Sequence, residues 1–237
     1  MTKENFLFGI IGLLLGLIIG FMFANSVNQS AMTQMPGAMT QVPGAMSQNP
    51  NMPPGHPAIP GNDGAMQAQV QAAIDKAKAE PNNFEAQIKA AEVFYQIQRF
   101  EGAIEFLQQA NKLKPDDYET IVNLGNSYFD AGNYAEAEKW YSSALAKKPD
   151  DVNVRTDLGL TFIFREPPNY DRAVQEFTRS LEKDPNHKQT LQNMTVAYTK
   201  KGDAAKAKET LARLEGVDPT NAAIPKLREE IQKLETK

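Results

Sequence analysis

The alternation of apolar and polar residues is clearest in residues 123–150, which read NLGNSYFDAGNYAEAEKWYSSALAKKPD. Two short helix-like runs flank segment 130–133, whose Asp, Gly and Asn are typical turn residues. Pro149 ends the second run, because proline lacks a backbone donor and disfavours helical geometry in the residue before it. The stretch therefore predicts two helices folded against each other.

The same pattern recurs along the chain. The prolines that end the second helices are 34, 34, 36 and 34 residues apart, at Pro81, Pro115, Pro149, Pro185 and Pro219. An aromatic residue falls late in each first helix, at Phe94, Tyr128, Phe162 and Tyr198. A small residue falls within each second helix, at Ala103, Ala137, Ala173 and Ala207. A fixed period in this range predicts stacked hairpins, each burying its apolar side against the next.

Gly125 lies in the middle of a predicted first helix, where glycine costs about 1 kcal/mol relative to alanine. Its lack of a side chain permits a close approach by the second helix. We therefore expect Gly125 to mark the crossing point of the two helices.

The longest apolar run is FLFGIIGLLLGLIIGFMFA, residues 6–24, which follows a flank of residues 1–5. As a helix rising about 1.5 Å per residue, it would span roughly 28 Å, close to the hydrocarbon thickness of a bilayer. The run predicts a transmembrane anchor. The alternative is a cleaved signal peptide, whose apolar core is usually about 7–15 residues, and Met22 spoils the nearest cleavage motif. Lys3 favours a cytoplasmic N-terminus, with the repeats outside the cytoplasm.

Three glycines of this run, Gly12, Gly16 and Gly20, fall on one face of the predicted helix. Small residues at this spacing allow close helix packing in membranes, so they offer a route to homo-oligomers. Glycine is also common in membrane helices generally, and this simpler explanation stays open.

Residues 25–64 predict a disordered tether. The seven-residue unit AMTQMPG is followed by AMTQVPG and AMSQNPN, and no charged residue lies between Glu4 and Asp63. This Pro- and Gly-rich composition cannot bury enough apolar surface to offset the entropy of ordering. Its methionines and His56 offer soft ligands to Cu(I), but duplication of a linker unit explains the methionines more simply.

Composition and motifs exclude several functions. The formal net charge is −4, so nothing suggests a nucleic-acid surface. The chain has no cysteine and only two histidines, His56 and His187, which excludes thiolate sites and histidine clusters for metals. Carboxylates lie among lysines as on solvated helix faces, and no phosphate loop or nucleophile elbow is present. We predict no enzymatic activity, no catalytic residue, no cofactor and no metal.

The repeat resembles that of the tetratricopeptide repeat (TPR) family. The 34-residue period and the family's motif positions are matched at Leu124, Gly125, Tyr128, Ala137, Tyr141, Ala144 and Pro149. The resemblance implies an all-α, TPR-type α-solenoid of stacked helical hairpins, here with an N-terminal transmembrane helix and a disordered linker. The third repeat departs from the pattern by two extra residues in the turn 164–170, and the first and fourth lack the Leu-Gly pair. The implied units are an N-terminal capping helix at 65–83, repeats at 84–117, 118–151, 152–187 and 188–221, and a C-terminal capping helix at 222–237.

The resemblance also implies a function. In this family the first helices line a concave groove that commonly holds an extended peptide or a partner helix. One subclass grips acidic chaperone C-termini, but Val122, Asp157 and Gln189 stand where it needs basic residues, so we reject that ligand. We expect a membrane-tethered adaptor that binds a protein or peptide partner, with residues 6–24 in the lipid bilayer; a self-assembling membrane scaffold is the alternative. The implied groove residues are Ile88, Glu92, Tyr95, Val122, Asn123, Asn126, Phe129, Asp157, Leu160, Ile163, Phe164, Gln192, Asn193, Val196 and Thr199.

Overall fold

A computed structural model describes residues 63–236, which contain ten α-helices and no strand. The predicted anchor at 6–24, its glycines and nearly all of the predicted tether at 25–64 lie outside the described residues. Within the described part, no helix is both long and apolar enough to cross a bilayer. The helices are α2 (Asp63–Ala79), α3 (Phe84–Gln96), α4 (Phe100–Leu113), α5 (Tyr118–Asp130), α6 (Tyr134–Lys147), α7 (Val152–Phe164), α8 (Tyr170–Lys183), α9 (Lys188–Lys201), α10 (Ala204–Val217) and α11 (Ile224–Glu235).

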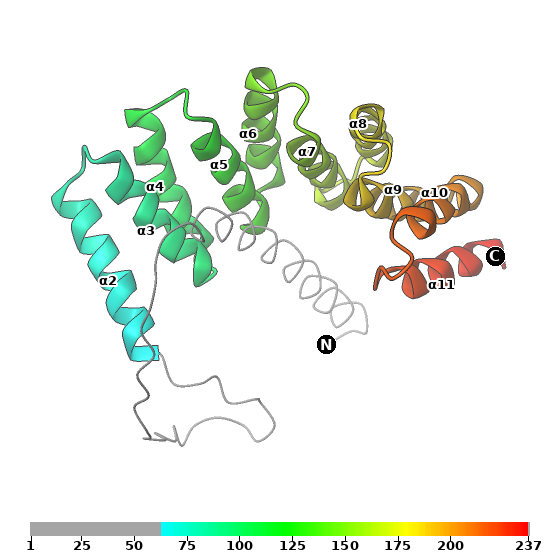
Figure 1. The fold of residues 1–237 in the computed structure, drawn as a ribbon, viewed down its shortest axis with the longest axis horizontal. Coiled ribbons are helices and arrows are strands. Elements are labelled where there is room, and N and C mark those ends of the chain that lie inside the picture. The colour runs from blue at the N-terminus through cyan, green and yellow to red at the C-terminus, as the bar shows by residue number, and fades with distance from the viewer. Residues whose placement is uncertain (1–62, 237) are drawn as a thin grey trace, which may run out of the picture. The chain divides into compact units, whose positions relative to one another are not determined.

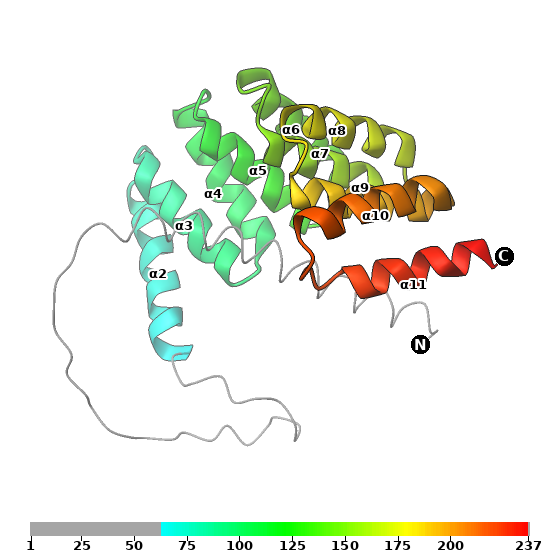
Figure 2. The same ribbon diagram turned by 45° about the vertical axis from the view of Figure 1, so that its right-hand side comes forward.

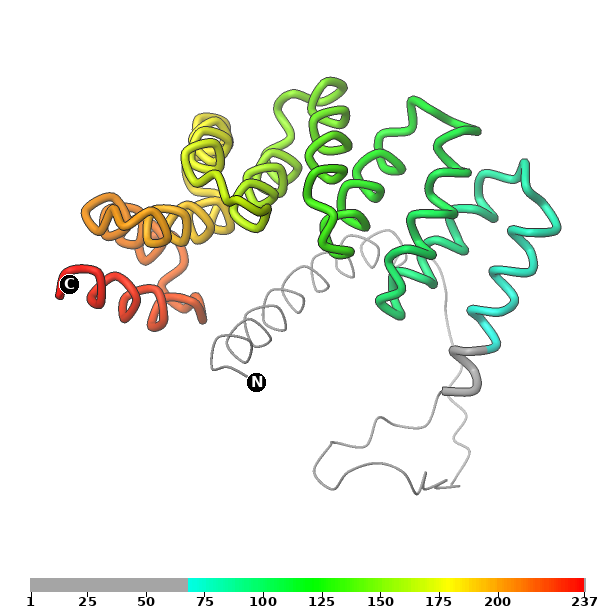
Figure 3. Tube along the Cα trace, turned by 180° about the vertical axis from the view of Figure 1, so that it is seen from behind, coloured from blue at the N-terminus to red at the C-terminus, as the bar shows by residue number. Residues whose placement is uncertain are grey.

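The helices pack as successive hairpins (Figure 1). Helices α3 and α4, α5 and α6, α7 and α8, and α9 and α10 form the pairs, and each pair contacts the next through α4–α5, α6–α7 and α8–α9. Figure 2, turned by 45°, shows that the hairpins follow one another in the order of the chain. Figure 3 shows α2 and α11 at opposite ends of the row. The described residues thus form the all-α array of helical hairpins that the repeat period predicts.

The prolines that define the period follow the second helices. α4, α6, α8 and α10 each end two residues before a proline. The residue between is extended, with φ between −146° and −127° and ψ between 71° and 93° at Lys114, Lys148, Asp184 and Asp218. The clash between a proline ring and the preceding residue favours this conformation, so proline stops the helix one residue early.

Side-chain caps fix where most helices begin. Asp117 and Asp151 accept hydrogen bonds from the backbone N–H groups of Thr120 and Val154, at the starts of α5 and α7. Such caps satisfy one of the four backbone donors left free at a helix N-terminus. The sequence motif Pro-Asp-Asp, found before both helices, therefore ends one helix and begins the next.

The close approach expected at Gly125 is present. A Cβ atom added there would lie 2.6 Å from the Tyr141 ring, and one added at Gly159 would lie 2.3 Å from the Phe177 ring. The first hairpin reverses the arrangement, because Gly102 on its second helix faces the Phe94 ring of its first helix. Each glycine makes room for an aromatic ring where two helices cross.

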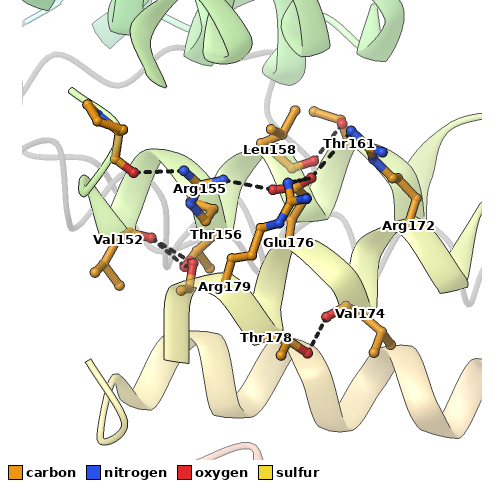
Figure 4. Close-up of polar contacts among 12 residues, drawn as sticks. Val152, Arg155, Thr156, Leu158, Thr161, Arg172, Val174, Glu176, Thr178 and Arg179 are labelled. Atoms are coloured by element: carbon orange, nitrogen blue, oxygen red, sulfur yellow. Dashed lines mark hydrogen bonds and ion pairs between the residues drawn. The ribbon is translucent and has the colours of Figure 1, made fainter. Parts of the chain in front are cut away.

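A buried ion-pair cluster joins α7 to α8 (Figure 4). The carboxylate of Glu176 is only 1% exposed. It accepts from the Arg155 guanidinium of α7 at 3.0 Å, and the guanidinium groups of Arg172 and Arg179 lie 3.4 and 3.2 Å away. A buried charge of this kind is tolerated because it is surrounded by opposite charges.

Helices α2 and α11 flank the four hairpins. α11 buries Ile224, Leu227 and Ile231 and packs on α9 and α10. α2 buries Ala77, whose carbonyl accepts a hydrogen bond from Gln87 Nε2 at 2.8 Å. α2 begins at Asp63, inside the segment predicted as linker, since no proline lies between Pro60 and Pro81 to stop the helix.

Candidate partner-binding face

The implied groove residues lie on α3, α5, α7 and α9, the first helices of the four hairpins. We call their partly exposed members, together with Asp130 and Tyr134 described below, the first-helix face. The partly exposed predicted residues are Ile88, Glu92, Tyr95, Val122, Asn123, Asn126, Phe129, Asp157, Ile163, Phe164, Gln192 and Val196.

Three of the predicted residues are buried instead. Leu160 is 4% exposed and belongs to the hydrophobic core. Thr199 is 8% exposed, and its hydroxyl donates to the Thr195 carbonyl at 2.8 Å. Asn193 is 4% exposed, and its Nδ2 group has no hydrogen-bond partner among the described residues. These three side chains take part in packing rather than in an exposed surface.

Contacts between neighbouring hairpins bring the face together. The Tyr95 phenol of α3 donates a hydrogen bond to the Asp130 carboxylate at the end of α5. The Phe129 ring of α5 meets the Phe164 ring of α7 edge-on, with ring centres 5.7 Å apart. Tyr134 stacks on Phe164 at 6.0 Å. The ends of α3, α5 and α7 therefore share one polar and aromatic cluster.

A buried hydrogen-bond partner fixes the side chain of Asn126. The hydroxyl group of the buried Tyr141 donates to Asn126 Oδ1 at 2.9 Å. Burial raises the pKa of Tyr141 well above its usual value, so the hydroxyl stays a donor. The Asn126 Nδ2 group makes no hydrogen bond to another described residue, which leaves its two N–H donors for a ligand.

Two carboxyl groups in this region have raised pKa values. Burial, reinforced by the charges of Asp151 and Asp130, raises the pKa of Asp157 to about 7. Burial also raises the pKa of Asp130, and the hydrogen bond from Tyr95 partly opposes that increase. Within residues 63–236, no lysine or arginine nitrogen forms an ion pair with either carboxylate.

Asp130 and Tyr134 belong to this cluster, yet the sequence prediction omitted them. The sequence predicts a turn from residue 130, but Asp130 is the last residue of α5. It lies one helical turn after Asn126, so the four-residue spacing could have placed it on the same face. Tyr134 is the first residue of α6, a second helix, so a prediction based on first-helix positions could not include it.

The face carries side chains of several chemical kinds. It combines apolar, aromatic, amide and carboxyl side chains, and the part of the chain that the structure describes has no group of three His, Asp or Glu side chains arranged to hold a metal ion. Aromatic rings supply contact area and amides pair with a peptide backbone.

Comparison with known proteins places the chain in a family. Family models described as tetratricopeptide repeat match residues 67–118, 98–158 and 168–231, more than half of the chain. No curated protein matches the sequence.

Solved structures agree with this fold. The MamA 41-end structure from Desulfovibrio magneticus RS-1 is 16% identical, with a TM-score of 0.60, and the match covers 67% of this chain and 89% of that one. A second MamA structure is 22% identical, with a TM-score of 0.59 and coverages of 67% and 86%. YrrB, described as a TPR protein with an unusual peptide-binding site, is 17% identical, with a TM-score of 0.60 and coverages of 70% and 84%. The chain belongs to the tetratricopeptide repeat family.

Proposed function

We propose that this protein is a membrane-tethered adaptor that captures a protein or peptide partner in the groove lined by the first-helix face. Membership of the TPR family supports binding to a protein partner, because these repeats typically serve as non-enzymatic scaffolds. The single observation that carries the proposal is the run of partly exposed apolar, aromatic and amide side chains across α3, α5, α7 and α9.

An extended partner segment would find two kinds of contact on this face. Ile88, Val122, Ile163 and Val196 offer apolar area, which gives up water on binding. Asn126, fixed by Tyr141, offers N–H donors to a peptide carbonyl. Apolar contacts then supply affinity and the amide fixes the direction of the segment.

The tether gives the array reach from the membrane. Residues 6–24 have the length and apolarity of a membrane span, and the roughly forty residues after it would reach about 35 Å as a flexible chain. Holding the array near the bilayer raises the local concentration of a membrane-associated partner without any new contact. On this proposal the N-terminus is cytoplasmic and the repeats are extracytoplasmic.

Affinity capture from the native host tests the proposal. The full chain carrying Phe129→Ala and Ile163→Ala is compared with the unchanged chain and with Val217→Ala, which removes an exposed apolar side chain of α10 outside the face. Loss of central aromatic contacts typically costs tenfold or more in affinity, so we expect the double variant to lose the partner and Val217→Ala to keep it.

Phe129 also packs on Phe164 and Tyr134, so the double variant needs a check of its fold by circular dichroism. Val122→Ser and Val196→Ser, which change partly exposed side chains, serve as a milder pair. Equal capture by both pairs and by the unchanged chain would contradict the proposal. Sedimentation of the full chain separates the alternative, a self-assembling scaffold, because that protein would form large assemblies without a partner.

A further inference from the structure

Two acidic side chains of the first-helix face lack a cationic neighbour among residues 63–236. Asp130 accepts a hydrogen bond from Tyr95, whereas Asp157 has neither a hydrogen bond nor an ion pair with a described residue. The two groups sense each other, because the charge of Asp130 disfavours ionisation of Asp157. Both side chains are partly exposed, and burial of the carboxyl groups raises their pKa values because it disfavours the charged form.

Two other acidic groups of the array have cationic partners. Glu176, the other enclosed acid, is surrounded by Arg155, Arg172 and Arg179 (Figure 4). On the surface, Asp150 pairs with Lys183 of the following repeat at 2.7 Å. Unlike Glu176 and Asp150, Asp130 and Asp157 form no ion pair with a described residue.

Aromatic side chains lie beside Asp130, and the charge of Asp157 acts on one of them, Tyr95. Tyr95, the hydrogen-bond partner of Asp130, meets Phe100 edge-on with ring centres 5.4 Å apart. Tyr134 meets Phe129 at 5.3 Å, and the charge of Asp130 contributes to its raised pKa. Ring faces attract cations, and they do so more strongly where water is excluded. A carboxylate with aromatic side chains beside it matches the charge of a lysine or arginine side chain and offers contact area to its apolar stem.

We propose that Asp130 and Asp157 receive a lysine or arginine side chain of the segment that binds to the first-helix face. The inference rests on the proposed function and specifies the partner, which is an extended segment with at least one cationic side chain beside apolar ones. The incoming cation relieves the repulsion between the two carboxylates and makes charge-assisted hydrogen bonds to them. Because the ligand supplies the cation, the site discriminates between segments: a cationic segment pairs with the two acids, whereas a neutral segment would leave them unpaired.

A display selection with the full chain tests this inference. A library of random twelve-residue peptides is selected on the unchanged chain, on an Asp130→Asn and Asp157→Asn double variant, and on Asp116→Asn as a control. Asparagine keeps the shape of aspartate and an acceptor for Tyr95, so the double variant is expected to fold. Asp116 is an exposed acid outside the face and loses the same charge.

We expect the unchanged chain and Asp116→Asn to enrich peptides with a lysine or arginine at a fixed position, and the double variant to lose this preference. An enriched peptide is then labelled with fluorescein and compared, by anisotropy, with its counterpart carrying norleucine in place of the cation. The cationic peptide should bind the unchanged chain about tenfold or more tightly than the norleucine peptide. The double variant should bind the two with nearly equal affinity.

The outcomes separate this inference from the proposed function. Enrichment of neutral or acidic peptides that Phe129→Ala and Ile163→Ala no longer bind would overturn the cationic preference and leave the adaptor function standing. Equal binding of the lysine and norleucine peptides by the unchanged chain would overturn it as well. Failure of the unchanged chain to enrich any peptide would contradict the capture of extended segments, and the inference would fall with it.

Discussion

Single residues decide how closely the helices of this array approach. Gly125 and Gly159 face the rings of Tyr141 and Phe177 at distances that no side-chain carbon can occupy. The sequence identified Gly125 because a glycine in mid-helix has a cost that close packing can offset. It did not reveal Gly102, because the first hairpin carries its glycine on the opposite helix.

Replacing Gly125 with alanine should therefore destabilise the protein, although alanine is the better helix former. The added methyl group meets the Tyr141 ring, and overpacking of this kind typically costs about 1–3 kcal/mol. Gly216→Ala on α10 is the matched control, because the added carbon would meet no neighbouring side chain or other helix within 4 Å, and it should be neutral or stabilising. Urea denaturation followed by circular dichroism measures both; a Gly125→Ala protein as stable as the control would refute close packing at this point.

Asp157 should make stability depend on pH between about 4 and 7. Its pKa rises from 3.8 to about 7 on folding, so the folded protein binds more protons than the unfolded chain in this window. The contribution of Asp157 to stability accordingly falls as pH rises from 4 to 7. His187 acts in the opposite direction, because burial lowers its pKa and its contribution is lost as pH falls below about 6.5.

The Asp157→Asn variant isolates the carboxylate from other groups. It should be more stable than the unchanged chain at pH 7.5, by roughly 1–3 kcal/mol, and the gain should vanish near pH 4. Urea midpoints over a pH series measure the difference. If the variant were less stable than the unchanged chain at pH 7.5, or if its added stability did not depend on pH, ionised Asp157 would not destabilise the fold.

At the scale of helices and turns, the sequence was most informative about where each helix begins and ends. The prolines and the aspartates after them indicate where second helices end and first helices begin, and both effects are local. Burial of individual positions is not local. α9 packs against α7, α8, α10 and α11, which fits the burial of Asn193 and Thr199. The position of a residue within the repeat does not show how many neighbouring helices cover it.

The Glu176 cluster links α7 to α8 and should contribute to stability at this scale. Glu176→Gln leaves three arginines without the carboxylate that balances them, and breaking a buried ion pair costs about 3–5 kcal/mol. Since Arg172 and Arg179 are about half exposed, a loss of roughly 2–3 kcal/mol is expected. Glu182→Gln, an exposed change on α8, is the control and should have little effect in the same thermal or urea unfolding experiment. Equal stability of the two variants would show that the cluster is dispensable.

At the scale of the whole molecule, we expect the array of hairpins to bind the partner and the N-terminal segment to hold the array at the membrane. The array follows from a repeat that cannot bury its apolar side alone. The anchor and tether are sequence predictions from residues 6–24 and 25–64, which lie outside the described part of the chain.

Membrane fractionation tests the anchor. The full chain should stay in the membrane pellet after washing with alkaline carbonate, and deletion of residues 2–24 should release it. Protease added to intact cells should digest the repeats if they lie outside the cytoplasm. Release of the full chain by carbonate would contradict the anchor, whereas protection from protease would reverse its orientation.

Partner capture on the first-helix face is the central claim, and site-specific photocrosslinking in cells tests it most directly. p-Benzoylphenylalanine is placed in the full chain at Val122 on α5 and, in a separate protein, at Glu182 on the exposed side of α8. We predict a discrete crosslinked partner from position 122 that is absent from position 182 and is lost when Asp130 and Asp157 are both changed to asparagine or when Phe129 and Ile163 are changed to alanine. Crosslinks from position 182 alone, or from neither position, would contradict capture on this face.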